Sequence, residues 1–399
     1  MTSTDTTKTA PGRFFSQRAM TAFAAFSLGA ILAGSAAPTP LYRLYQEAWA
    51  LSHVTLTAIF SVYAITLLLS LLTVGSLSDY IGRRPVIFAG LLLTVVAMGI
   101  FYAADSATHL IIARAIQGIA TGTLMSTLGA TVLDTNKAKG PLINSVTPLF
   151  GMSAGALAAS ALATYAPDPL HLVYEILLAM FLVMAVLVWQ MPETVSAQPG
   201  ALASLKPHVF VPKQARRALL RVTPVNIANW ALGGFYLSLM PSLLRLATGL
   251  TSPFVGGGIV ALLTISGAVA ILLVRRHAET KVLIGGAGLL AVGVAVTLSG
   301  VYLQDVALLL LGTLVAGLGF GSSFFGATQS FLPLAGAHER AGLLSAFLVQ
   351  SYLAFSLPVM LVGMLAPVFG LAHATYLYGG TIIVLALVSL TATVIVARR

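Results

Sequence analysis

Residues 75–85 of the chain read GSLSDYIGRRP. This short polar segment contains Asp79 and the neighbouring pair Arg83 and Arg84, although only 8% of all residues are charged. Apolar runs long enough to cross a bilayer flank it on both sides, whereas a turn in a soluble protein needs no such neighbours. The segment is therefore predicted to be a charged turn between two membrane-spanning helices.

The composition of the 399-residue chain is that of a membrane protein. Hydrophobic residues make up 58% of it, and its charged fraction is far below the roughly 25% of soluble proteins. The chain has no cysteine, which excludes disulfides and thiolate metal sites. Its net charge of +10 is carried mostly by short loops between apolar runs, as in membrane proteins. The expected partner is therefore the lipid bilayer, and nucleic acid is not expected.

A spanning helix needs about 20 largely apolar residues, and about twelve segments meet this requirement. They are residues 18–39, 54–76, 85–104, 108–133, 142–165, 170–191, 221–246, 252–274, 281–301, 305–331, 340–366 and 371–397. The one long polar interval is basic and divides them into two sets of six. We predict an all-α membrane protein with a cytoplasmic tail (1–17), a six-helix bundle (18–191), a cytoplasmic linker (192–220) and a second six-helix bundle (221–399).

The first apolar run could alternatively belong to a signal peptide, because small residues occupy positions 34–37. The apolar core of a signal peptide is only ~7–15 residues long, and the run over 19–37 is longer. We therefore expect it to be an uncleaved spanning helix.

The positive-inside rule predicts the orientation of the chain. If the N-terminus is cytoplasmic, only Arg43 and Arg245 of the 21 basic residues fall in the opposite loops, and only Arg114 falls within a helix. The reverse orientation would place nearly all of the positive charge outside. We therefore expect both termini to be cytoplasmic.

The opening segment resembles the loop between helices 2 and 3 of the major facilitator superfamily. Every fixed position of that family pattern matches except Tyr80, where the family usually has a basic residue. The resemblance implies a conformational latch between helices 2 and 11 in the outward-facing state, formed by Gly75, Asp79, Gly82, Arg83 and Arg84. Gly75 would allow a close approach between helices, and Gly82 would allow a tight turn. Alternatively, these charges only anchor a cytoplasmic turn.

Ionisable residues within the predicted helices are rare. Arg114 and Gln117 resemble the helix-4 signature of proton-coupled members of the family, which implies a role in proton coupling. A guanidinium near the membrane centre costs about 2.5 kcal/mol or more, so Arg114 needs a partner; the alternative is that it extends to the outer headgroups. Glu175 is a third coupling candidate if it is buried, although its position near the outer surface favours a structural role. Asp134 is expected to be a loop charge near Lys137.

Two further motifs concern the subtype. Pro38 and Pro40, at the end of the first predicted helix, resemble the pattern of twelve-helix drug exporters, with one residue fewer between the prolines. In the fifth helix, Ala156 stands where antiporters usually have a proline after a Gly-x-x-x-Gly sequence, which weakens an antiporter assignment. A Gly-x-x-x-Gly spacing also recurs at Gly118 and at Gly317, as expected for a duplicated bundle.

In the second half, the middle portions of predicted helices 7, 8, 10 and 11 carry no ionisable residue. Their aromatic and amide residues are expected to line a substrate cavity: Asn226, Asn229, Trp230, Tyr236, Gln329, Gln350 and Tyr352. Such a lining suits amphipathic or weakly charged solutes. A dianion carrier would need more bases than Arg114.

The chain has no nucleotide-binding loop and no metalloprotease or hydrolase motif, so neither an ATP-driven pump nor an enzyme is expected. The resemblance implies a secondary active transporter of a small organic molecule, monomeric and without a cofactor, driven by the proton gradient across the cytoplasmic (inner) membrane of a bacterium. The Arg114 motif and the helix-1 prolines favour efflux of the proton-coupled drug-exporter type. The alternative is an importer or facilitator of a small metabolite; a membrane-embedded enzyme or sensor is disfavoured because no extramembrane domain is predicted.

Overall fold

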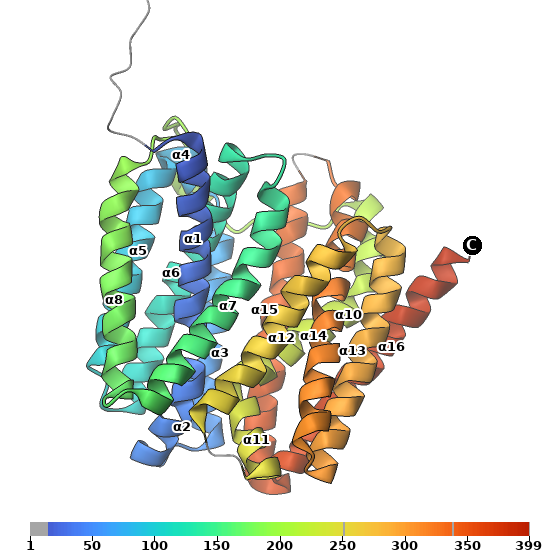
Figure 1. Cartoon of the computed structure of the whole chain (residues 1–399). Helices are drawn as coiled ribbons and strands as arrows, with labels where there is room; N and C mark the ends of the chain where they lie inside the picture. Colours follow the sequence, from blue (N-terminus) through green and yellow to red (C-terminus); the bar gives the residue numbers. More distant parts are fainter. Residues whose placement is uncertain (1–14, 250–251, 337–338, 399) are drawn as a thin grey trace, which may run out of the picture.

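The computed structural model describes residues 15–249, 252–336 and 339–398. Most of the predicted tail, with Lys8 and Arg13, and the terminal Arg399 lie outside these ranges. Within them every regular element is a helix (Figure 1). The helices are α1 (Gln17–Ala36), α2 (Pro38–Trp49), α3 (His53–Thr73), α4 (Ser78–Ile81), α5 (Arg83–Tyr102), α6 (Ala107–Thr135), α7 (Gly140–Tyr165), α8 (Pro169–Leu187), η1 (Val188–Gln190), α9 (Ala201–Ser204), α10 (Lys213–Ser238), α11 (Met240–Thr248), α12 (Pro253–Val274), α13 (Glu279–Leu303), α14 (Val306–Phe331), η2 (Leu332–Leu334), α15 (Arg340–Phe369) and α16 (Leu371–Ala397).

The number of spans agrees with the sequence analysis. In the described chain, 11 helices are long and apolar enough to cross a membrane, or 12 if the bent pair α10 and α11 forms one span. The prediction of an all-α membrane protein with about twelve spans is therefore confirmed.

Two short helices, α2 and α11, were not predicted as separate elements. Helix α2 follows α1 directly and lies almost wholly beyond the first predicted span (18–39), whereas the seventh predicted span (221–246) divides into α10 and α11, which meet at an angle of 67°. Each short helix has a proline in its first turn, where the missing N–H leaves no donor unsatisfied. Because α2 and α11 also carry polar residues, hydropathy alone does not mark them.

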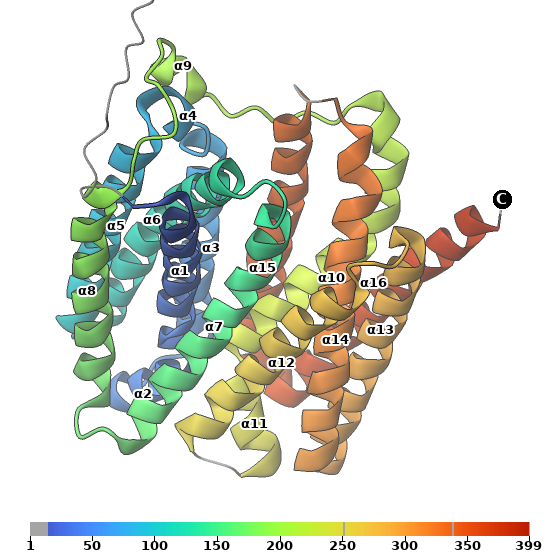
Figure 2. The ribbon, with the colours of Figure 1, turned by 45° about the horizontal axis from the view of Figure 1, so that its top comes forward.

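The two short helices lie at the end of the molecule opposite the linker. We call the end with α4 and α9 the linker end and the end with α2 and α11 the far end (Figures 1 and 2). Figure 2 shows the chain passing from α9 to α10 at the linker end. The predicted linker (192–220) overlaps α10, which begins at Lys213; its first turns are basic and therefore lay outside the apolar window.

The two halves meet along two long seams, α3 against α15 and α7 against α12. Inside each half, glycine allows one pair of helices to pack closely, and the pairs of the two halves are alike. A Cβ at Gly122 of α6 would lie 2.6 Å from the Leu67 carbonyl oxygen of α3, and one at Gly317 of α14 would lie 2.5 Å from the Leu263 carbonyl oxygen of α12. The recurrent Gly-x-x-x-Gly segments thus hold equivalent helix pairs together, as a duplicated bundle requires.

Candidate functional site

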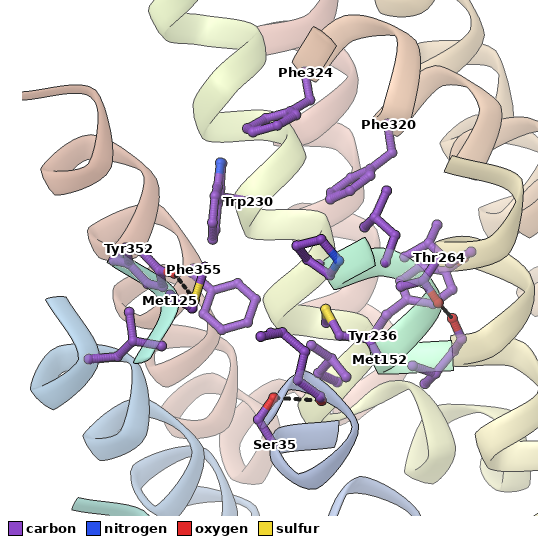
Figure 3. Close-up of a pocket in the computed structure, with 18 of the residues that line it drawn as sticks. Ser35, Met125, Met152, Trp230, Tyr236, Thr264, Phe320, Phe324, Tyr352 and Phe355 are labelled. Atoms are coloured by element: carbon purple, nitrogen blue, oxygen red, sulfur yellow. Dashed lines mark hydrogen bonds between the residues drawn. The ribbon is translucent and has the colours of Figure 1, made fainter. Parts of the chain in front are cut away.

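A cavity of about 210 Å³ lies between the two halves (Figure 3). Helices α1, α3, α6 and α7 contribute to its wall from the first half, and α10, α12, α14 and α15 from the second. The lining is mainly aliphatic, aromatic and methionine side chains, with a few neutral polar residues. Among the described residues, no Asp, Glu, Lys or Arg lines it.

Three of the predicted cavity residues lie in this wall: Trp230, Tyr236 and Tyr352. The Trp230 ring lies 4.8 Å from the Tyr352 ring and 5.6 Å from the Phe355 ring, between centroids, which forms an aromatic corner (Figure 3). The buried Trp230 Nε1–H has no hydrogen-bond partner among the described residues. An unpaired donor of this kind costs free energy unless a bound solute or water accepts from it.

The predicted asparagines are used for helix packing instead. Asn226 Nδ2 donates to Ser351 Oγ at 3.0 Å, and Asn229 Nδ2 donates to Ser323 Oγ at 2.8 Å. Both asparagines are buried and lie outside the cavity wall. They join α10 to α15 and to α14, because an amide in an apolar bundle is most stable when a neighbouring helix satisfies it.

The two predicted glutamines also lie outside this wall. Gln350 Oε1 accepts from Thr223 Oγ1 at 3.0 Å, which joins α15 to α10. Gln329, near the linker end of α14, has an exposed side chain. The sequence did not distinguish these amides from the cavity residues, because the rotation of each helix about its axis decides which side chains face the cavity.

Much of the actual lining was not predicted from the sequence: Phe60, Tyr63, Met125, Asn144, Met152, Phe320, Phe324 and Phe355. Apolar side chains in a membrane protein can face lipid, core or cavity, so their type carries no information about the site. The i, i+4 spacing of Phe320 and Phe324 indicates only that both lie on one face of α14.

Arg114 is fully enclosed, with 1% of its surface exposed. Its Nε and Nη2 donate to the Tyr42 hydroxyl at 2.9 and 2.5 Å. Its Nη1 donates to the Ser35 carbonyl oxygen at 2.9 Å and to Gln117 Oε1 at 2.8 Å. The alternative that Arg114 extends to the outer headgroups is therefore wrong. Tyr42 and Ser35 belong to the first span, far away in the sequence.

Aromatic rings complete the enclosure of this guanidinium. Its carbon lies 5.5, 5.2 and 5.8 Å from the ring centroids of Tyr42, Tyr63 and Phe101. Gln117, also buried, donates to the Gly34 carbonyl oxygen at 2.9 Å and so fixes the side chain that accepts from Arg114. Cation–π contacts and neutral acceptors replace the carboxylate that a buried arginine usually needs.

Glu175 has a different environment from that of Arg114. Its side chain on α8 is exposed, and it has no hydrogen bond or ion pair with any described residue. The condition of a buried carboxyl, on which its coupling role depended, is therefore not met.

The far end of the molecule is joined by polar contacts between the halves. Glu47 of α2 lies 2.9 Å from Arg245 of α11. Nearby, Thr39 Oγ1 donates to the Leu237 carbonyl oxygen at 2.9 Å. Within the described chain, every hydrogen bond or ion pair between the two bundles lies at the far end or in the middle of the helices. The linker end has none, so the far end is the closed end of this conformation.

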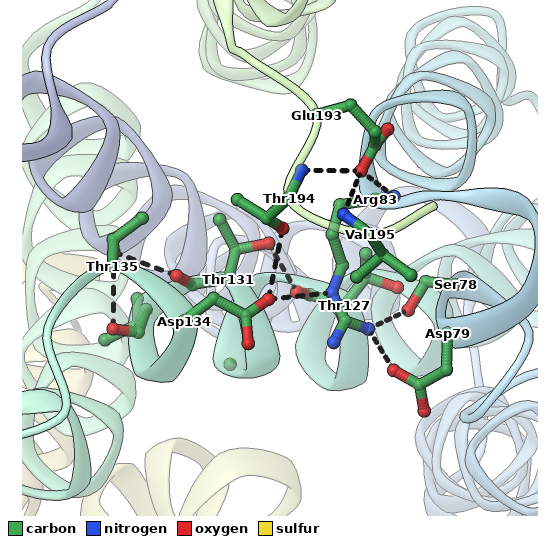
Figure 4. A network of polar contacts seen from close by, with 12 residues as sticks. Ser78, Asp79, Arg83, Thr127, Thr131, Asp134, Thr135, Glu193, Thr194 and Val195 are labelled. Atoms are coloured by element: carbon green, nitrogen blue, oxygen red, sulfur yellow. Dashed lines mark hydrogen bonds and ion pairs between the residues drawn. The ribbon is translucent and has the colours of Figure 1, made fainter. Parts of the chain in front are cut away.

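The predicted latch residues lie at the linker end, in a network around Arg83 (Figure 4). Arg83 Nη1 lies 2.6 Å from Asp79 Oδ1 and 2.6 Å from Ser78 Oγ, and its Nε lies 3.1 Å from Asp134 Oδ2. Asp79 makes no contact of this kind with α15 in the described residues. The network therefore holds α4, α5 and α6 together within the first half.

Asp134 and Glu193 are functional candidates that the sequence analysis did not identify. Asp134 was expected to be a loop charge, but it lies on α6 and binds both Arg83 and the Thr194 hydroxyl, each at 3.1 Å. Glu193 accepts from the backbone N–H groups of Arg83 and Arg84, at 2.8 and 3.0 Å. A carboxylate in this position caps the N-terminus of α5, where the helix dipole favours negative charge.

Two glycines of the latch segment, Gly82 and Gly75, are required for different reasons. Gly82 has a φ of +98°, and a Cβ there would lie 2.7 Å from Glu193 Oε2, so a glycine is required for both the turn and the cap. Gly75 was expected to permit close approach between two helices. Instead, a Cβ at Gly75 would collide with the carbonyl oxygen of Leu71 in the last turn of α3, so the turn that follows this helix requires glycine.

Comparisons with known proteins agree with this architecture. A family model described as Major Facilitator Superfamily matches residues 19–358. A comparison with curated protein sequences finds no match.

Several solved structures share the fold. The nucleoside transporter NupG has a TM-score of 0.74 at 13% identity, and the match covers 94% of this chain and 100% of NupG. The human organic anion transporter MFSD10 (TETRAN) has a TM-score of 0.69 at 16% identity, covering 96% and 100%. A POT family transporter in complex with 5-aminolevulinic acid has a TM-score of 0.75 at 13% identity, covering 93% and 95%.

Proposed function

Because the chain belongs to the Major Facilitator Superfamily, we propose that it is a secondary active transporter that exports a small amphipathic organic solute in exchange for protons. Its family makes it a transporter rather than an enzyme. One observation supports alternating access most directly. The cavity lies between the two bundles, and the polar contacts between those bundles are confined to the middle and the far end.

The distribution of Lys and Arg supports an orientation with the linker end in the cytoplasm. In that orientation the conformation described above is closed on the outside, and the latch at Asp79 is not engaged with α15. We place the protein as a monomer in the cytoplasmic membrane of a bacterium. Its energy source is the proton gradient, with no cofactor.

The enclosure of Arg114 supports a role in proton coupling. A buried cation held by neutral groups is sensitive to any change of charge in the adjacent cavity wall. The uncharged lining of that cavity supports the alternative, an importer or facilitator of a small metabolite. A facilitator needs no titratable group, and the described membrane interior offers the cavity no carboxylate.

The solved relatives do not decide the solute. They are a nucleoside transporter, an organic anion transporter and a POT family transporter in complex with 5-aminolevulinic acid, and at 13–16% identity the likeness concerns the fold alone. The chemistry of the cavity is a better guide. Its aromatic and methionine lining suits a ring-containing solute with few polar groups.

The test uses everted membrane vesicles that contain the full chain, with an imposed pH gradient and a panel of amphipathic aromatic solutes. A solute that accumulates with the gradient and is released by an uncoupler supports the exporter. Equilibration that ignores the gradient supports the facilitator. Vesicles without the protein are the control, and no difference between them and the wild type would refute transport of these solutes.

A further inference from the structure

The charge of Arg114 has no counterion in the described chain. The described acids lie at helix ends or in loops, except Glu175, whose side chain is exposed. The six ion pairs of the described residues involve other side chains. Arg114 donates only to a hydroxyl, a backbone carbonyl and an amide oxygen. A full positive charge thus lies uncompensated in the membrane interior, which is costly.

This charge lies directly behind the cavity wall. Ser35 and Tyr63 contact Arg114 on one side, the first through its carbonyl oxygen and the second through its ring, 5.2 Å away. Both residues also line the cavity. No acid among the described residues lines the cavity, so none offsets this charge there. In a low-dielectric interior, the electric field of the guanidinium extends across the one side chain that separates it from the cavity. The cavity therefore has a positive potential.

The aromatic remainder of the lining selects the shape of the solute. Trp230, Phe324, Tyr352 and Phe355 present ring faces and edges, against which a flat aromatic solute can pack. Aromatic rings also attract cations, so the rings alone would favour an organic cation. The buried guanidinium opposes that preference.

From these observations we propose that the cavity binds aromatic monoanions, such as aromatic monocarboxylates, in preference to organic cations, and that Arg114 determines this preference. The inference rests on the proposed transport function and specifies its substrate class. A monoanion compensates the charge of Arg114 without a direct ion pair, whereas a dianion would carry an unmatched negative charge into the interior. Arg114 acts here as a specificity-determining residue behind the wall.

Three probes with one ring system test the charge preference: 2-naphthoate, 2-naphthol and 2-naphthylmethylammonium, which are anionic, neutral and cationic near neutral pH. Their binding to the purified full chain is measured by isothermal titration calorimetry. We expect 2-naphthoate to bind about tenfold or more tightly than the cationic probe, with 2-naphthol between them. Arg114→Gln should remove most of this ratio, and Arg114→Lys should keep it. Arg276→Gln, which removes an exposed arginine of the linker end, is the matched control and should leave the ratio unchanged.

The ratio of affinities separates specificity from folding, because a purely structural defect weakens all three probes alike. If Arg114→Gln does not fold, the wild type and Arg114→Lys still decide. Wild-type protein that binds the cationic probe as tightly as 2-naphthoate overturns the proposal. So does an Arg114→Gln variant that folds and keeps the wild-type ratio. Failure of all three probes to bind also overturns it, while transport itself is decided independently by the vesicle assay.

Discussion

Arg245 Nη1 lies 2.9 Å from Glu47 Oε1, and this ion pair joins the short helix of one half to the corresponding short helix of the other. Glu47 also accepts from Arg43 Nε at 3.0 Å. Arg43 and Arg245 each follow a proline at the start of α2 or α11, so the two halves place equivalent arginines around one carboxylate. The closed far end is thus built from corresponding elements of the two halves.

The first prediction is that Glu47→Gln favours opening of the far end. The pair is half-exposed, so its contribution is about 0.2–1 kcal/mol, which shifts the equilibrium only a few-fold. The chain has no cysteine, so a single Ser61→Cys variant reports opening through labelling by an impermeant maleimide from the far side. Labelling should be faster with Glu47→Gln and unchanged with Glu279→Gln, an exposed acid at the other end. Equal rates in all three would contradict a gating role.

The second prediction concerns the turn before α5. Gly82→Ala should destabilise the protein by about 1–3 kcal/mol, because the residue has a positive φ and the added methyl group displaces the Glu193 cap. Gly99→Ala is the matched control: a Cβ there meets no atom within 4 Å, and alanine favours a helix. Thermal unfolding in detergent should show a lower midpoint for Gly82→Ala alone. Equal midpoints would mean that the cap is unimportant.

The third prediction separates the latch from simple anchoring. In this conformation the Asp79 side chain binds only Arg83 among the described residues, and it is half-exposed, so Asp79→Asn should cost at most about 1 kcal/mol of stability. If Asp79 binds α15 in the outward-facing state, the same variant should lose most transport in the vesicle assay. Normal transport by a stable Asp79→Asn protein would leave these charges as anchors of the turn.

The fourth prediction tests the enclosure of Arg114. Tyr42→Phe removes the hydroxyl that accepts from both Nε and Nη2, and hydrogen bonds of a charged group contribute about 1.5–3 kcal/mol. We therefore expect a loss of about 2 kcal/mol in thermal unfolding together with reduced transport. Tyr165→Phe, at an exposed tyrosine, should change neither quantity. A stable Tyr42→Phe protein would show that another group, or water, satisfies the guanidinium.

The sequence predicted those features that depend on local pattern. Apolar length predicted the number of spans, and the glycine and charge spacing of the latch segment identified the turn before α5. The break between α10 and α11 was missed because the seventh predicted span runs through it, and α2 was missed because it lies almost wholly beyond the first apolar window, although Pro38 marks where α2 begins.

The environment of a side chain was predicted less well, because it depends on helices that are distant in the sequence. Arg114 is buried by Ser35 and Tyr42, and no local rule distinguishes that arrangement from extension to the headgroups. Asp134 is near Lys137 along the chain, but its partner Arg83 comes from another helix. Likewise, the hydroxyls that pair with Asn226 and Asn229 could not be foreseen without the rotation of α10.

The fifth prediction concerns Trp230, which lines the cavity and whose buried indole N–H has no hydrogen-bond partner among the described residues. Trp230→Phe keeps an aromatic ring and removes the donor. Because a buried donor without a partner is unfavourable, loss of the N–H should stabilise the empty protein, partly offset by the smaller ring. If the N–H binds the solute, the same change should weaken the probe that the wild type binds most tightly among the three naphthalene compounds. A neutral hydrogen bond contributes about 0.5–1.5 kcal/mol, so the dissociation constant should rise about two- to tenfold.

Trp189→Phe, at a tryptophan outside the cavity, should leave this dissociation constant unchanged. Greater stability with weaker binding would identify Trp230 as a solute ligand. If Trp230 only packed, Trp230→Phe would lower both the stability and the affinity. Unchanged binding would show that the N–H is not used.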